Sequence, residues 1–296
     1  MRLKLVRYLF PVVLFGMCIP AARGADITVP VVALPSPPAI GGDDKVWSLL
    51  QQRLTPIPTH PSAGGEDEAA TAGDTWAPDL KIAAGIHADG VFFLAEWSDE
   101  KAGTTYRPWQ RLRDRYTRSR ERDDMLAMRF QMGADFDVCM LSRTTYHVDM
   151  WHWTAGRSNL VGIADDMSTR FSISPLTPAV EYPIAGGTVY IQRTYDDGDD
   201  GRENVRTPTE RTENVIPSVV ALGKPGGSRA DVAANGRWLD GRWMVRFSRR
   251  LNTGDPGDVV FEKGSKQVMQ IAVFNSGYTM RKHISDEIHL DFSELR

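Results

Sequence analysis

The sequence predicts an all-β protein, an antiparallel β-sandwich whose short helices lie in loops. Short runs of β-branched and aromatic residues recur along the chain, and turn signals such as Asp89-Gly90 separate them. In residues 242–247 the two-residue period of a strand places Trp243, Val245 and Phe247 on one face and Arg242, Met244 and Arg246 on the other. Helical periodicity is scarce. Many short strands with little helix are typical of a sandwich.

The first 24 residues have the layout of a secretory signal peptide. Arg2, Lys4 and Arg7 form a basic start, residues 8–20 form a mostly apolar run, and Ala22-Arg23-Gly24 offers a cleavage site. The apolar run is too short for a spanning helix, although a retained anchor is the alternative. We therefore expect residues 1–24 to be removed and the protein to be periplasmic.

Loss of that segment leaves an acidic protein. It removes four basic side chains, so the 35 Lys and Arg of the whole chain fall to 31, against 38 Asp and Glu. Nucleic acid is a poor candidate as a partner, because its phosphates bind basic surfaces. No later stretch is long and apolar enough to span a membrane.

The rest of the chain divides into an extended lead-in and one domain. Residues 25–44 are rich in Pro, Gly and β-branched residues, whereas residues 45–296 predict a single sandwich. Residues 81–97 predict a hairpin around Asp89-Gly90. Residues 109–122 contain six arginines, which predicts a solvated loop or short helix. A docking patch for an acidic partner is the alternative.

The second half of the chain supplies most of the other strands. We expect strands within residues 125–132, 188–193, 230–247, 267–274 and 284–292. The acidic loop 196–204 has carboxylates that suit Ca²⁺. Its spacing does not match an EF-hand, so a solvated loop is favoured.

Common hydrolytic and nucleotide-binding motifs are missing from the sequence. It contains no Gly-x-Ser-x-Gly, His-Glu-x-x-His or Walker loop. Asp165 and Asp166 point to opposite faces of a strand, so they are a weak pair for glycoside hydrolysis. Cys-x-x-Cys-His is also missing, so any haem is bound without thioether links.

Two distant segments hold the side chains that best suit a haem iron. Met140 precedes an aromatic-rich strand, and its thioether is a neutral ligand that can be buried without a charge. Lys282 and His283 follow about 140 residues later and face opposite sides of a strand, so only one can bind. Lys282 shares its side with Ile284 and is slightly favoured if Ile284 packs inward. As a ligand the lysine must be neutral, which burial promotes.

Aromatic side chains alternate along the strand that follows Met140. Trp151 and Trp153 share one face, with His152 on the other. Indole rings of this size wall a flat macrocycle or fill an ordinary core. His147 lies nearby, so it and His283 leave a bis-His or His–Met site open as alternatives.

The chain resembles the haem-binding domain of the ethylbenzene dehydrogenase γ subunit and related haem subunits over most of residues 45–292. The match rests on Trp and Gly spacings in four segments: Leu94–Asp99, Val148–Asp166, Asp231–Thr253 and Ala272–Ser285.

This resemblance implies a sandwich similar to carbohydrate-binding and DOMON-type modules, with one non-covalent haem b. It implies Met140 and Lys282 as the metal ligands, although the methionine register can slip to Met132 or Met150. It also implies electron transfer between a molybdenum–iron–sulfur partner and a cytochrome c, by a non-catalytic subunit rather than an enzyme. A carbohydrate-binding module without haem and a redox enzyme with an open iron position are the rival hypotheses.

Overall fold

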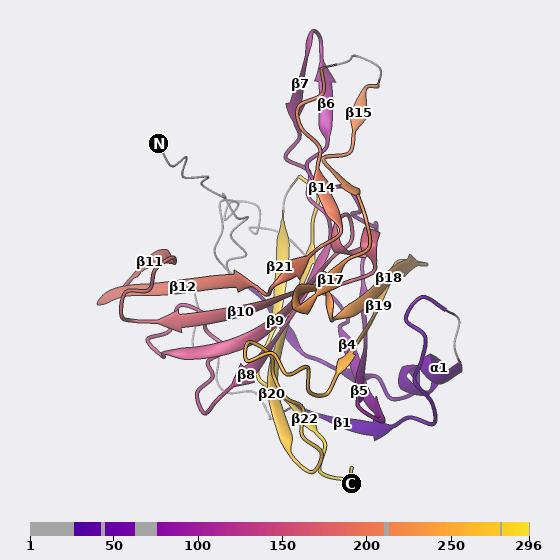
Figure 1. Ribbon diagram of the computed structural model, residues 1–296, viewed down its shortest axis with the longest axis vertical. Helices are drawn as coiled ribbons and strands as arrows, with labels where there is room; N and C mark the ends of the chain where they lie inside the picture. Colours follow the sequence, from indigo (N-terminus) through magenta and orange to yellow (C-terminus); the bar gives the residue numbers. More distant parts are fainter. Residues whose placement is uncertain (1–26, 43–44, 63–75, 210–212, 279, 296) are drawn as a thin grey trace.

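The computed structural model of the 296-residue chain describes residues 27–42, 45–62, 76–209, 213–278 and 280–295. The expected signal peptide, residues 1–24, lies outside this range. Figure 1 shows strands throughout the molecule and one short helix at its side, α1 (Lys45–Gln51). The prediction of an all-β sandwich is confirmed.

The strands follow one hydrogen-bonded path that folds into two layers. The first layer contains, in spatial order, β11 (Val180–Ile184), β12 (Gly187–Tyr195), β10 (Asp165–Ser172), β9 (Tyr146–Thr154), β8 (Met125–Met132), β20 (Lys266–Asn275) and β22 (Ile288–Asp291). At its edge β21 (Arg281–Ser285) pairs with β20 and with β3 (Thr59–Pro61). The second layer contains β4 (Lys81–His87), β5 (Gly90–Ser98), β19 (Arg242–Arg250) and β18 (Ala233–Leu239), with β2 (Thr55–Pro56) beside β4.

One strand joins the two layers. The first half of β1 (Ile27–Ala33) pairs with β22 and its second half pairs with β4. Both pairings are parallel, so the fold is not purely antiparallel as the sequence predicted. Val29 and Val31 are buried in the core, so within the expected lead-in residues 27–33 form a core strand. A Pro- and β-branched-rich strand without charges suits this position between two sheets.

The facing sides of the two layers bury a large cluster, which we call the sandwich core. It is rich in aromatic side chains, which meet mostly edge-on or tilted. Trp97, Trp153 and Trp243 form one group, and Phe93, Trp151 and Phe261 form another. The alternation in β19 places Trp243, Val245 and Phe247 in this core, as expected from the sequence.

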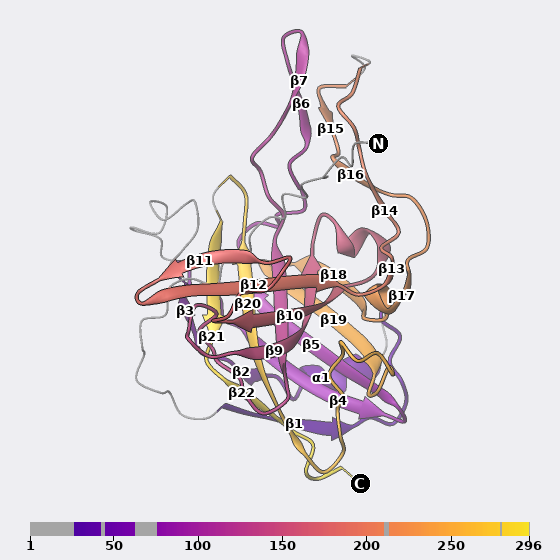
Figure 2. The same ribbon diagram turned by 60° about the vertical axis from the view of Figure 1, so that its left-hand side comes forward.

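A three-stranded arm projects from the sandwich (Figures 1 and 2). It consists of β6 (Trp109–Leu112), β7 (Arg115–Arg118) and β15 (Val215–Ile216). The expected loop or short helix at 109–122 is therefore a hairpin, and that prediction was wrong. The hairpin is supported from outside the segment, because β15 pairs with β6 and the Trp109 indole donates to the Val205 carbonyl at 3.0 Å. Within the hairpin, the Arg118 guanidinium lies over the Trp109 ring.

Small elements complete the described part of the chain. Two short pairings, β13 (Gly198–Asp199) with β17 (Gly226–Gly227) and β14 (Arg202–Asn204) with β16 (Val219–Ala221), lie between β12 and β18. Two 3-10 turns, η2 (Ser158–Val161) and η3 (Ser228–Ala230), follow β9 and β17. As expected, the helical segments are short and lie outside the sheets.

Candidate functional site

The first layer is buried on its outer face as well. A second cluster lies there, which we call the methionine cluster because Met125, Met140, Met150 and Met167 belong to it. Its other buried members are Ala127, Tyr146, Val148, Phe171, Val189, Ile191, Ala272, Phe274 and Ile284. The strand residues among them come from β8, β9, β10, β12, β20 and β21, and along β8, β9 and β20 they alternate with sandwich-core residues.

Met140 reaches this cluster from the loop between β8 and β9, and it is 1% exposed. Buried Arg129 on β8 fixes that loop, because its Nη2 donates to the carbonyls of Asp137 and Val138 at 2.7 Å each. Gln270 on β20 donates to the Val138 carbonyl at 3.3 Å. Two strands of the sheet thus hold the backbone two residues before Met140.

Lys282 reaches the same side of the sheet from β21. It is paired with Phe274, a member of the methionine cluster, and residues paired across an antiparallel ladder project to the same face. Its side chain is buried, and burial lowers the pKa of the ammonium well below its usual value. The nearby positive charges of Arg193 and Arg129 lower that pKa further. The environment therefore favours the neutral amine, which is the form that binds a metal.

His283 lies on the opposite face of β21. It is paired with Val273 of the sandwich core, and its Nδ1 lies 3.1 Å from the Thr59 hydroxyl. The ring meets Trp76 edge-on at 5.2 Å between centroids. The geometry thus brings Lys282 to the side of Met140 and leaves His283 away from it. Ile284 packs in the methionine cluster, whereas Ile288 and Leu290 pack in the sandwich core.

The face of β9 opposite to the methionine cluster carries Trp151, Trp153 and His147, so these residues do not share a site with Met140 and Lys282. Both indoles are fully buried in the sandwich core, so the expectation that they wall a haem beside Met140 needs correction. His147 is half-buried, and its Nε2 lies 2.7 Å from the Ser168 hydroxyl. Burial lowers the pKa of His147, with a smaller contribution from Arg170. The two-residue period of β9 separates all three from Met150 and Val148.

The two methionines that could replace Met140 as the sulfur ligand, Met132 and Met150, lie on opposite faces of the sheet. Met150 belongs to the methionine cluster and is 3% exposed. Met132, at the end of β8, shares its face with the core residues Met128 and Phe130. Among the methionines considered from the sequence, Met140 and Met150 therefore lie on the side of Lys282.

His152 is a buried polar residue on the methionine side that the sequence left without a role. Its pKa falls to about 4, because of burial first and the charge of Arg157 second. Its Nε2 accepts or donates no hydrogen bond within the described residues, and neither does the buried Thr169 hydroxyl on the same face of β10. The sequence pattern could have identified His152, because it lies between Trp151 and Trp153 on one strand and must therefore face the side opposite to them.

The residues on this face fit a haem. The cluster offers a thioether on a fixed loop, an amine whose neutral form is favoured by burial, and a wall of methionine and aromatic side chains. The buried His152 and Thr169 polar atoms without partners are consistent with a face built to contact another group. Within the described residues no helix is long and apolar enough to cross a membrane.

Comparison with known proteins gives a family match and distant structural similarities. Residues 44–285 match the family model described as ethylbenzene dehydrogenase. No curated protein matches the chain. Its structure is similar to a family 9 carbohydrate-binding module from Caldicellulosiruptor kristjanssonii in complex with glucose, at 10% identity and a TM-score of 0.36, over 88% of this chain and 95% of that chain. A putative carbohydrate-binding protein from Bacteroides uniformis gives 6% identity and a TM-score of 0.40, over 90% of this chain and all of that chain.

Proposed function

Because this chain belongs to the ethylbenzene dehydrogenase family, we propose that it is a b-type haem protein that transfers electrons for a larger oxidoreductase. In this proposal Met140 and Lys282 would hold the haem iron. The observation that supports it most is their common position, since both are buried on the methionine side of one sheet although they are far apart in the sequence.

Each side chain has a separate task in this proposal. Haem supplies a centre that gains and loses one electron. Met140 contributes a neutral sulfur, which favours the reduced iron and so raises the potential. Lys282 contributes an amine, whose neutral form is favoured by burial and by the charges of Arg129 and Arg193. The methionine cluster excludes water, which keeps the iron site dry and its two ligands in place.

The partners and the location follow from the same proposal. The protein is exported through residues 1–24 to the periplasm and passes electrons as a subunit or partner, not as the catalytic chain. The resemblance of the sequence to haem subunits points to a molybdenum–iron–sulfur protein and a cytochrome c on the two sides of the electron path.

A carbohydrate-binding module without haem is the second candidate, and the tryptophans argue against it. A sugar platform needs exposed coplanar indoles. All eight tryptophans lie within the described residues, and none is exposed. The three half-buried ones donate their indole N–H to backbone carbonyls: Trp76 to Ser98, Trp109 to Val205 and Trp238 to Asp99.

The proposal is tested by loading the purified protein with haem and recording oxidised and reduced absorption spectra with haem quantitation. We expect one haem per chain, a sharp Soret band, reduced α and β bands, and release of intact haem into pyridine. Reduced wild-type protein should not bind carbon monoxide, because Met140 and Lys282 would both be bound to the iron. A colourless protein after loading rejects the haem, whereas carbon monoxide binding favours the rival enzyme with an open iron position.

The sulfur ligand is identified by three single substitutions. Met140→Leu should open the iron to carbon monoxide and lower the potential, because leucine has a similar volume and no donor atom. Met132→Leu, on the opposite face, is the control and should leave both readouts at the wild-type value. If Met150→Leu opens the iron and Met140→Leu does not, the axial sulfur belongs to β9.

A further inference from the structure

Three aspartates from distant parts of the chain meet inside the sandwich, and we call them the acid cluster. Asp149 lies on β9, Asp166 on β10 and Asp258 in the loop after β19. All three are buried, and one carboxylate oxygen from each lies within 4.8 Å of those of the other two. They project into the sandwich, on the face opposite to the methionine cluster.

Arg249 of the opposite layer is the cation bound to this cluster. Its Nη1 lies 2.7 Å from Asp149 Oδ2, 3.4 Å from Asp166 Oδ2 and 3.7 Å from Asp258 Oδ2. The arginine therefore contacts one oxygen of each carboxylate. The Val259 backbone N–H also donates to Asp149 Oδ2 at 2.9 Å.

The other oxygens of these carboxylates lack donors. Oδ1 of Asp149, of Asp166 and of Asp258 is buried and accepts no hydrogen bond within the described residues. The Asp149 and Asp166 side chains are 0% exposed, so bulk water does not solvate them. Buried carboxylate oxygens without partners are rare because their desolvation is unfavourable.

More carboxylates surround the three. Asp231 lies beside Asp166, and Asp196 lies beside Asp258, with one buried oxygen of each lacking a donor. Within the described residues, five carboxyl groups therefore lie in and around a cluster whose three central members share one guanidinium, that of Arg249.

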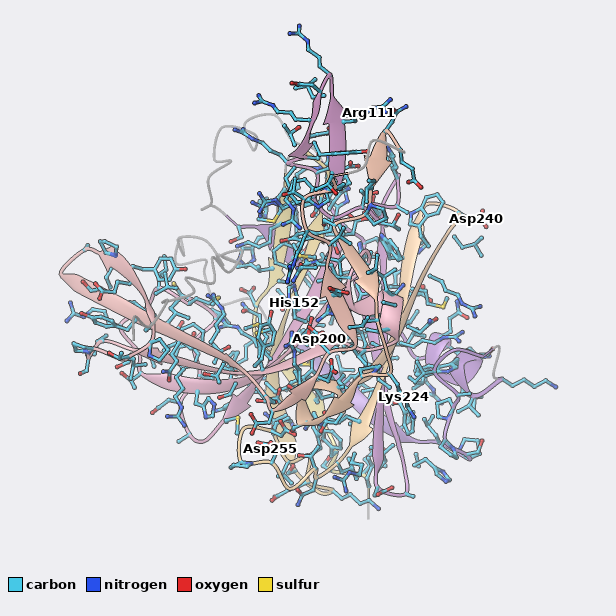
Figure 3. The ribbon with its side chains drawn as sticks, turned by 45° about the horizontal axis from the view of Figure 1, so that its top comes forward. Arg111, His152, Asp200, Lys224, Asp240 and Asp255 are labelled. Atoms are coloured by element: carbon cyan, nitrogen blue, oxygen red, sulfur yellow. The ribbon has the colours of Figure 1, made fainter. Side chains whose placement is uncertain are left out.

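A neighbouring group of charged side chains, unlike the acid cluster, has equal numbers of acids and bases. Asp165 follows the opposite phase of β10, and together with Asp200 it is paired with two arginines, Arg202 and Arg229. Two acids and two bases balance there. Figure 3 labels Asp200 in the middle of the view and, lower down, Asp255, which marks the loop that carries Asp258.

We propose that Asp149, Asp166 and Asp258 bind a calcium ion that joins the two layers of the sandwich. Oxygen-only ligands suit a hard cation, and the cluster contains no His or Cys to favour zinc or copper. Ca²⁺ accepts oxygen ligands in flexible geometry, which suits carboxylates from three separate elements better than the strict octahedron that Mg²⁺ requires. Water and the neighbouring acids complete its shell.

The wild-type protein tests this directly by thermal unfolding after treatment with EGTA. Restoring millimolar Ca²⁺ should raise Tm by roughly 5 °C, because an ion that binds only the folded state stabilises it. Tb³⁺ should bind one equivalent and emit on indole excitation, since Arg249 lies against both the acid cluster and Trp151, 4.8 Å from the ring centroid. Unchanged Tm and no emission would overturn the proposal.

Matched variants locate the ion. Asp166→Asn should abolish Tb³⁺ emission and the Ca²⁺-dependent rise in Tm, whereas Asp165→Asn, its neighbour on the other face, should keep both. Asp258→Asn in the loop repeats the test if Asp166→Asn does not fold. Emission that survives both cluster variants but is lost in Asp200→Asn would place the ion in the acidic loop and overturn this assignment. Haem loading is measured separately, because the ion and the iron lie on opposite faces of the sheet.

Discussion

The two faces of β9 show how one strand can serve two different interiors. Its even-numbered residues, such as Val148 and Met150, face the methionine cluster, and its odd-numbered residues, such as Trp151 and Trp153, face the sandwich core. The core is aromatic and contains the acid cluster, whereas the other face is sulfur-rich and receives Lys282. The face of a residue therefore says more about its role than its position in the sequence.

The largest expected effect on stability comes from removing Arg249, whose guanidinium joins the two layers by binding Asp149 and Asp166. Arg249→Met leaves buried carboxylates without their guanidinium, so the free energy of unfolding should fall by about 3–5 kcal/mol. Urea denaturation measures this loss. Arg250→Met is the control, because Arg250 is exposed, and its effect should stay within about 0.5 kcal/mol. Equal losses would contradict the role given to Arg249.

The next largest effect is a pH dependence of folding stability that comes from His152, the buried histidine on the methionine side. The pKa of His152 is about 4 in the folded state and about 6.5 in the unfolded chain, so the unfolded state binds the proton first. Folding stability should therefore fall as pH decreases from 6.5 to 4, by on the order of 3 kcal/mol from this group.

His152→Gln should flatten that part of the stability curve relative to the wild type. Because the two proteins share all their other titrating groups, the difference between their curves reports the histidine. His60→Gln, at a more exposed site, provides the control. Parallel curves for wild type and His152→Gln would contradict a neutral buried imidazole.

A smaller effect separates the core tryptophans from the proposed iron site. Trp153→Phe loses the indole hydrogen bond to Asn159 and part of the packing against Trp97 and Trp243. We expect a loss of about 2 kcal/mol in unfolding free energy with an unchanged reduced haem spectrum. A shifted reduced haem spectrum together with an unchanged free energy of unfolding would indicate that Trp153 contacts the haem.

The smallest expected change in unfolding free energy comes from replacing one of two buried threonines, Thr169, and Thr154 provides the comparison. Thr169→Val removes a buried hydroxyl that has no partner within the described residues, so unfolding should change by less than about 1 kcal/mol, towards higher stability. Thr154→Val removes a hydroxyl bonded to Ser158 at 3.1 and 2.9 Å and should lower stability by about 1–2 kcal/mol. The reverse order in urea denaturation would mean that Thr169 makes a bond in solution.

The sequence predicted those parts of the fold whose pattern is local. Regular alternation identified β19, and the turn Asp89-Gly90 identified the β4–β5 hairpin. The arm escaped prediction because its strands carry exposed arginines, and its pairing partner β15 lies about 100 residues downstream. The parallel pairings of β1 depend on distant strands and leave no local signal.

The candidate site was predictable only in part. Adjacent residues on a strand face opposite sides, so Lys282 and His283 could be separated from the sequence, and Lys282 could be grouped with Ile284. The sequence did not show that β8, β9 and β20 are buried on both faces, so it could not decide whether Trp151 and Trp153 wall a haem or fill the core. Arg249 was the missed signal for the acid cluster, because it continues the inward phase of Trp243, Val245 and Phe247.

The most direct test of the proposed iron site compares Lys282→Ala with His283→Ala in haem-loaded protein. The two residues are neighbours of similar burial on opposite faces of β21. We predict that Lys282→Ala changes the reduced α and β bands and lets carbon monoxide bind, while His283→Ala keeps the wild-type spectrum. A wild-type spectrum in Lys282→Ala together with a changed one in His283→Ala would contradict an iron bound on the methionine side.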